Sequence, residues 1–104
     1  MSRLANPLRG EASFGVAGHE LILRPSFENL VAAEEELGSL FALVERASEG
    51  TLTIGEMATL IWHCLPVDQR PERDLVGKAV VDMGLVNATT PVRAILAQAL
   101  QGKG

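Results

Sequence analysis

Residues 24–50 read RPSFENLVAAEEELGSLFALVERASEG, and this stretch predicts two short helices in tandem. Ser26 can cap the first helix, because its hydroxyl can accept a hydrogen bond from a free N–H of the opening turn. Gly38 stops that helix, Ser39 can cap the second, and Gly50 ends it. Apolar residues recur at helical spacing on both sides of the stop: Phe27, Leu30, Val31 and Leu37, then Leu40, Leu43, Val44 and Ala47. Each helix is therefore expected to pack one apolar stripe against the rest of the fold.

Two short β-strands are predicted before this stretch, at residues 11–16 and 20–24. The link Ala17-Gly18-His19 contains a glycine that can take positive φ, as a tight hairpin requires. Because an isolated hairpin is marginal in water, we expect it to lie on the helices. Pro25 cannot donate to a β-ladder and marks the exit into the first helix. Residues 1–10 are expected to form a flexible arm.

The segment after Gly50 predicts a third and a fourth helix. Thr53-Ile54-Gly55-Glu56 matches a capping box, which predicts a helix over about residues 54–65. The sequence VDQRPER then indicates a polar, exposed connection. Proline is acceptable in the first turn of a helix, so the fourth is expected from about Pro71 to Met83.

Thr90 as a cap, followed by Pro91, predicts the start of a fifth helix. Its apolar stripe is the clearest in the chain: Val92, Ile95, Leu96, Ala99 and Leu100. The predicted fold class is α+β and mostly α, with an N-terminal β-hairpin packed on a bundle of about five short helices. Residues 11–101 are expected to form a single globular domain, and residues 102–104 a frayed tail.

The formal net charge is −4, and the acidic excess lies entirely in residues 1–50. That half holds four arginines against eight glutamates, whereas residues 51–104 hold five basic and five acidic residues. An acidic helical surface repels phosphate backbones, so no nucleic acid partner is expected. Such a surface suits either a basic protein partner or simple solvation.

The sequence predicts a cytoplasmic protein without a membrane segment. The single Cys64 excludes an internal disulfide framework and fits a reducing compartment. The N-terminus, MSRLANPLRG, lacks the continuous apolar region of a secretory signal. No window approaches the roughly 18 uninterrupted apolar residues that a spanning helix needs.

No catalytic, cofactor or metal site is predicted. Adjacent helical residues point about 100° apart, so His63 and Cys64 cannot easily chelate one ion. Cys64 lies in the most apolar helix, where burial should raise the pKa of its thiol, so a nucleophilic role is not expected. His63 is expected at the polar edge of a buried helix, and His19 in the hairpin turn. No phosphate-binding or dinucleotide-binding glycine pattern is present.

Glu34 is the one acid that falls on a predicted apolar stripe, between Leu30, Val31 and Leu37. A carboxylate there must reach water, or accept hydrogen bonds from a backbone end or from a basic group such as Arg24. Two readings remain: an acid at the edge of the stripe that reaches solvent, or a buried structural acid that fixes how the two helices and the hairpin meet.

The third helix is apolar nearly all round, which indicates either the centre of the core or a surface that faces a partner. The same alternative holds for the stripe of the fifth helix. Under the partner reading, the candidate partner-facing residues are Met57, Ile61, Trp62, Ile95 and Leu96. Under the other reading, they fill the core.

Three segments together resemble a known family: ANPLRGE at residues 5–11, LILRPSFENL at residues 21–30, and Glu34-x-x-Leu37-Gly38-Ser39-Leu40. They are similar to small proteins of gene transfer agents and related tailed phages, encoded in the tail gene cluster and described as tail tube or tail assembly chaperone-like. The positions that carry the resemblance are Asn6, Arg9, Gly10, Glu11, Leu23, Leu30, Glu34, Leu37 and Gly38.

The resemblance implies assembly of a tail rather than catalysis. The implied partners are phage-tail proteins, either the tape-measure protein or a tube subunit, and a homo-oligomer and incorporation into a phage-like particle stay open. Binding of a helix in a groove needs an apolar patch and no catalytic group. Two rival classes remain: an acidic regulatory adaptor that binds a basic partner, and a small-molecule-binding enzyme, for which the sequence offers no convergent set of polar groups.

Overall fold

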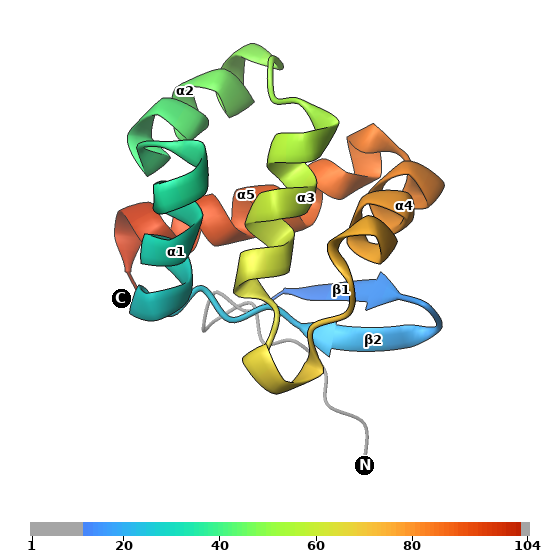
Figure 1. Cartoon of the computed structure of the whole chain (residues 1–104). Helices are drawn as coiled ribbons and strands as arrows, with labels where there is room; N and C mark the ends of the chain where they lie inside the picture. The colour runs from blue at the N-terminus through green and yellow to red at the C-terminus, as the bar shows by residue number, and fades with distance from the viewer. Residues whose placement is uncertain (1–11, 103–104) are drawn as a thin grey trace.

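The computed structural model describes residues 12–102, which form an antiparallel β-hairpin followed by five α-helices (Figure 1). The strands are β1 (Ser13–Val16) and β2 (His19–Ile22). The helices are α1 (Phe27–Leu37), α2 (Leu40–Glu49), α3 (Ile54–Cys64), α4 (Arg73–Met83) and α5 (Leu85–Gln101), with a short 3-10 turn at Val67–Gln69. The predicted fold class is confirmed. The arm predicted at residues 1–10, Glu11, and the last two residues of the predicted tail lie outside the described residues.

The hairpin turn consists of two residues, and both have positive φ: 50° at Ala17 and 82° at Gly18. Two such residues match the right-handed twist of the flanking strands, so the strands pair without splaying. His19 pairs with Val16 and is therefore the first residue of β2, not a turn residue as expected. Past the ladder, the N–H of Leu23 donates to the carbonyl of Ala12 at 2.7 Å, which continues the pairing toward α1.

The predicted helix caps are confirmed at α1, α2 and α3. Ser26 Oγ accepts from the N–H of Asn29 at 3.3 Å, and Ser39 Oγ accepts from the first turn of α2. At α3, Thr53 Oγ1 accepts from the N–H of Glu56 at 3.1 Å, and the Glu56 carboxylate accepts from the N–H of Thr53 at 2.9 Å. These bonds satisfy backbone donors that have no partner within the helix.

The start of α5 was wrongly predicted. The helix begins at Leu85, and Pro91 lies in its interior, so Thr90 is not its cap. Gly84, with φ of 91°, separates α4 from α5, and its carbonyl accepts from the N–H of Ala88 at 3.0 Å. Proline within a helix removes one hydrogen bond and crowds the preceding turn. In α5 the ring of Pro91 is buried, and packing along a 17-residue helix offsets that loss.

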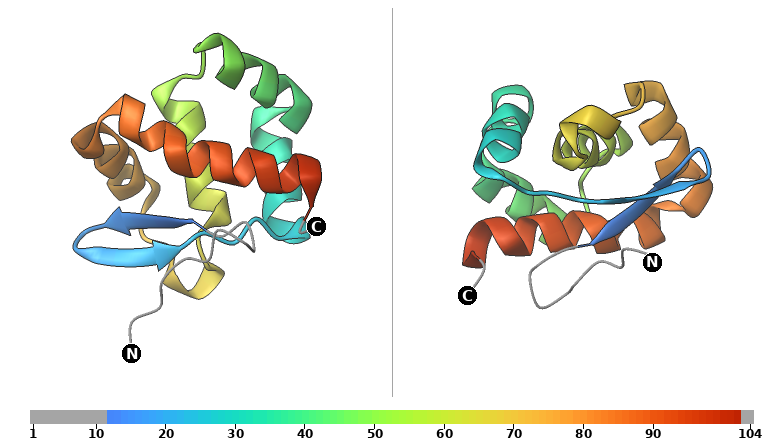
Figure 2. Two further views of the ribbon diagram at one scale, coloured as in Figure 1. Left: turned by 180° about the vertical axis from the view of Figure 1, so that it is seen from behind. Right: turned by 90° about the horizontal axis from the view of Figure 1, so that it is seen from below.

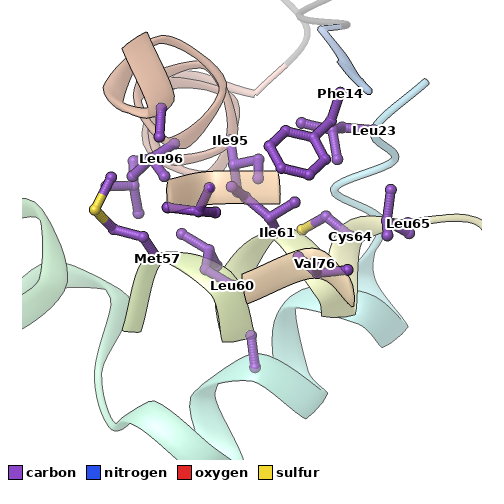
Figure 3. Packing of buried hydrophobic residues seen from close by; sticks show 14 of the residues in the cluster. Phe14, Leu23, Met57, Leu60, Ile61, Cys64, Leu65, Val76, Ile95 and Leu96 are labelled. Atoms are coloured by element: carbon purple, nitrogen blue, oxygen red, sulfur yellow. The ribbon is translucent and has the colours of Figure 1, made fainter. Parts of the chain in front are cut away.

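The core is organised around α3, which α1 and α4 flank and α5 crosses on the far side (Figures 1 and 2). Figure 3 shows buried side chains from the hairpin region, α4 and α5 converging on α3. The buried apolar residues are Phe14, Val16, Leu23, Ala33, Leu43, Met57, Leu60, Ile61, Cys64, Leu65, Val76, Val80, Ala88, Val92, Ile95 and Leu96. The hairpin supplies two of them, Phe14 and Val16, and Leu23 follows directly after β2, so the hairpin lies on the helices as expected.

The predicted apolar stripe of α1 is wrong in part. Phe27 is 78% exposed and Val31 is also exposed, whereas Asn29 and Ala33 are buried. Ala33 is fully buried in the core, and α1 packs against α3. Asn29 is held by two hydrogen bonds: its Nδ2 donates to the carbonyl of Arg24 at 2.8 Å, and its Oδ1 accepts from an arginine of the α3–α4 connection at 3.1 Å. Polar partners, not hydrophobicity alone, therefore set the inward face of this helix.

Candidate interaction surfaces

A polar joint formed by Glu36, His63 and Arg73 ties α1, α3 and α4 together. Arg73 donates to both carboxylate oxygens of Glu36, with Nη1 to Oε2 at 2.8 Å. His63 Nε2 lies 2.7 Å from Glu36 Oε1 and is the donor, because a carboxylate only accepts. Since each member comes from a different helix, the joint fixes the relative positions of those helices.

The charges of the polar joint hold each other in place. The bidentate contact with Arg73, followed by the bond from His63, lowers the pKa of Glu36 to about 2. The same carboxylate raises the pKa of Arg73. With its Nε2 proton directed at Glu36, buried His63 has no partner for Nδ1 within residues 12–102. The arrangement keeps Glu36 ionised and supplies no group positioned as a base toward open solvent.

The connection between α3 and α4 is not a simple exposed loop, because its residues contact the side chain of Trp62 and the C-terminal end of α3. The guanidinium groups of Arg70 and Arg73 lie over the Trp62 ring, 4.6 and 4.3 Å from its centroid. Trp62 Nε1 donates to the carbonyl of Pro71 at 2.9 Å. Arg70 also donates to the carbonyl of His63 at 2.7 Å, at the C-terminal end of α3 where helix carbonyls lack partners. The predicted reading of VDQRPER as exposed missed this role.

An apolar groove runs between α2 and α5 on another face, as two adjoining hollows of about 190 and 300 Å³. The first is lined by Ala47, Gly50, Leu52, Met57, Leu85, Val86, Thr89, Val92 and Arg93. The second is lined by Val44, Ala47, Ser48, Arg93, Leu96, Ala97, Leu100 and Gln101. Ala47 and Arg93 belong to both, so the hollows form one continuous surface, which we call the α2/α5 groove. Val86, at its edge, is 83% exposed.

A wider depression of about 850 Å³ lies between β2, the start of α1 and the 3-10 turn. Its lining is mainly polar and carries both signs of charge, with Glu20, Glu28 and Asp68 against Arg24. Within the described chain no three His, Cys, Asp or Glu side chains converge as metal ligands would. The depression therefore has the character of a hydrated surface.

The structure does not bring Glu34 and Arg24 together. Glu34 is exposed, and its Oε2 accepts from the N–H of Leu40 at 3.0 Å, at the start of α2. The side chain of Arg24 is exposed, while its backbone N–H donates to the carbonyl of Cys64 at 2.6 Å. Glu34 is thus not buried, but its carboxylate satisfies a backbone end, one of the roles considered for it.

Four of the five candidate partner-facing residues are buried: Met57, Ile61, Ile95 and Leu96. All four pack in the core around α3 (Figure 3). Ile61 and Ile95 line neither hollow, whereas Met57 and Leu96, each 4% exposed, also form part of the wall of the α2/α5 groove. Trp62 is half-buried beneath the two arginines described above. The predicted stripes of the second and fifth helices supply Val44, Ala47, Val92, Leu96 and Leu100 to the groove, but hydrophobic periodicity did not select Val86 and Arg93.

Cys64 is fully buried in α3, and burial raises the pKa of its thiol to about 12, as expected. A thiol with so high a pKa carries almost no thiolate near neutral pH. None of the helices in residues 12–102 combines the length and apolar character needed to cross a membrane.

The chain was compared with known protein families, curated proteins and solved structures. It matches the family described as phage tail tube protein, GTA-gp10, over residues 9–102. No curated protein and no solved structure matches it. The match covers nearly all of the chain and includes the hairpin, the five helices and both sides of the α2/α5 groove. The chain therefore belongs to the phage tail tube protein family GTA-gp10 and is a protein of a gene transfer agent or phage tail module.

Proposed function

We propose that this tail-module protein acts without chemistry of its own, as a chaperone-like tail assembly factor or a minor tail component. It holds an apolar helical segment of another tail protein, the tape-measure protein or a tube subunit, in the α2/α5 groove. The family places the chain among tail proteins, which work by contact with one another.

The observation that supports this proposal is the apolar groove that remains open beside a complete core. The linings of both hollows are mostly apolar, although the fold already buries 16 apolar residues, of which only Met57, Val92 and Leu96 also border the hollows. A helix brings its own backbone hydrogen bonds, so it can cover apolar surface between two other helices without leaving polar groups unpaired. A groove of this kind would shield a partner's apolar stripe until the tail is assembled.

The test is capture of the tail proteins encoded beside this chain, after co-expression, with two matched variants. Val86→Glu places a charge at the edge of the α2/α5 groove, whereas Phe27→Glu places the same charge on the outer face of α1. Both residues are highly exposed and lie in the first turn of a helix, where an acid is tolerated well. Capture should fail with Val86→Glu and persist with Phe27→Glu; equal capture by the two would contradict the groove.

The rival function, an acidic adaptor, is supported by exposed Glu28, Glu34, Glu35, Glu45 and Glu49 on α1 and α2. Capture through this surface would weaken steeply as salt rises, because exposed charges are screened. Capture through the acidic surface would also persist or strengthen in Phe27→Glu, because this variant adds one more acid. Capture that resists salt and depends on Val86 supports the groove instead.

A further inference from the structure

Arg93 is the only charged residue among those that line the α2/α5 groove. It borders both hollows, so a guanidinium lies midway along a surface whose other contacts are mostly apolar. Within residues 12–102 Arg93 forms no ion pair, unlike Arg46 and Arg73, which bind carboxylates. The chain as a whole is acidic, at −4, which makes this cation a local exception.

A helix seated in the groove would take water away from Arg93. A charge that loses its water without gaining a partner is costly, whereas a hydrogen-bonded carboxylate offsets much of that cost. Arg93 would also repel a lysine or arginine on the incoming helix, and this repulsion would disfavour helices with a positive charge at that position. Arg93 thus gives the groove a preference that apolar contacts alone cannot supply.

We infer that the segment recognised by the α2/α5 groove is an amphipathic helix of another tail protein with a carboxylate midway along its apolar stripe, paired with Arg93. This inference rests on the proposed function and specifies the chemistry of its partner. The 17 residues of α5 span about 25 Å, so three to five turns of partner helix fit alongside it, apolar at both ends of the contact. Charge complementarity with Arg93 is the reason for placing the acid at the centre.

The probe is a fluorescent synthetic amphipathic helix of about 18 residues, long enough to be partly helical in water. Leucines occupy both ends of its apolar stripe, and the central stripe position is Glu, Gln or Lys. Binding to the full chain is measured by anisotropy. The wild-type protein should bind the Glu peptide about tenfold more tightly than the Lys peptide, a difference typical of a close, partly buried charge pair.

Arg93→Glu should reverse this preference, and Arg93→Gln should remove it. Lys78→Glu is the matched control: it makes the same charge change on exposed α4, outside the groove, and should leave the preference as in wild type. No measurable binding of any peptide, an absent preference in wild type, or the same loss with Lys78→Glu would overturn the inference.

A second copy of the chain is the other occupant that the experiment must separate. The outer row of α1, with Phe27, Val31 and Glu35 at successive turns, also combines apolar residues with an acid. If the chain associates with itself, if Arg93→Glu abolishes this association, and if adding Glu35→Arg restores it, then the occupant of the groove is a second copy of the chain and not another tail protein. If the peptide preference holds while Val86→Glu leaves capture of tail proteins unchanged, the chemistry of the groove stands and the proposed function fails.

Discussion

Three consecutive glutamates on α1 have three different environments. Glu36 lies in the polar joint, Glu34 accepts a hydrogen bond at the start of α2, and Glu35 has no hydrogen-bond partner within the described chain. Successive residues on a helix point about 100° apart, so neighbours in sequence face different parts of the fold. The effect of removing each carboxylate should therefore differ.

Glu34→Ala should lower the melting temperature by about 4 to 8 °C, while Glu35→Ala should leave it nearly unchanged. Glu34 satisfies the N–H of Leu40 in the way of a capping residue, and the loss of a cap typically costs about 1 kcal/mol. In a domain of this size 1 kcal/mol corresponds to a shift of that order. Thermal unfolding followed by circular dichroism measures both variants. Equal shifts would show that Glu34 has no structural role beyond that of a surface acid.

Protonation of Glu36 should make the protein less stable in acid. The pKa of Glu36 is about 2 in the folded chain, below the ordinary glutamate value of 4.5, so its contribution to stability is complete above pH 4.5 and is lost as the pH falls toward 2. That pKa difference alone would correspond to about 3 kcal/mol of unfolding free energy. Because the side chain is 40% exposed, solvent screening leaves about 1 kcal/mol.

The variant that isolates this effect is Glu36→Gln, measured by urea denaturation between pH 2 and pH 7. Its unfolding free energy should lie about 1 kcal/mol below that of wild type near neutrality, and the two should converge near pH 2. The comparison removes the contribution of other carboxylates, including Glu56, whose pKa is lowered mainly by the backbone N–H of Thr53. A constant difference across the whole range would indicate lost packing and not lost charge.

At the scale of single elements, local chemistry predicted helix starts well wherever a side chain bonds the adjacent backbone. Ser26, Ser39 and Thr53 all act within three residues of their own position, so their effect is visible in the sequence. The start of α5 was missed because Pro91 is equally compatible with a first turn and with a buried interior site. Packing decides between these, and packing is not local.

Two threonines test this distinction. Thr53→Ala should lower the unfolding free energy by about 1 kcal/mol, because it breaks the capping box of α3. Thr90→Ala should change it by less than about 0.5 kcal/mol, because Thr90 is exposed within α5 and caps nothing. Urea midpoints at constant slope give both values. A large effect at Thr90 with little effect at Thr53 would show that Thr90 caps a helix and that Thr53 does not.

At the scale of the whole molecule, sequence spacing indicated some residues of the candidate surfaces but could not show which of them come together. Glu36 lies 27 residues from His63 and 37 from Arg73, so no motif marks the polar joint. The α2/α5 groove likewise joins two helices that are separated by α3 and α4. Hydrophobic periodicity did identify Ile95 and Leu96, but Ile95 is buried in the core, and Leu96 lines the groove with only 4% of its surface exposed. The open surface is what remains after the helices have packed, and only the tertiary arrangement specifies it.

Cys64 provides a measure of how the whole core opens. It is fully buried at the end of the central helix, and burial raises the pKa of its thiol to about 12. A disulfide reagent reacts with the thiolate, so labelling requires unfolding that exposes Cys64. At the usual stability of small domains, labelling of the native chain should be at least about a thousandfold slower than labelling in urea. Glu34→Ala should speed it about fivefold, by the factor that 1 kcal/mol represents, whereas Glu35→Ala should not. Rapid labelling of the native protein, unaffected by Glu34→Ala, would mean that the end of α3 opens on its own while the rest of the core stays closed.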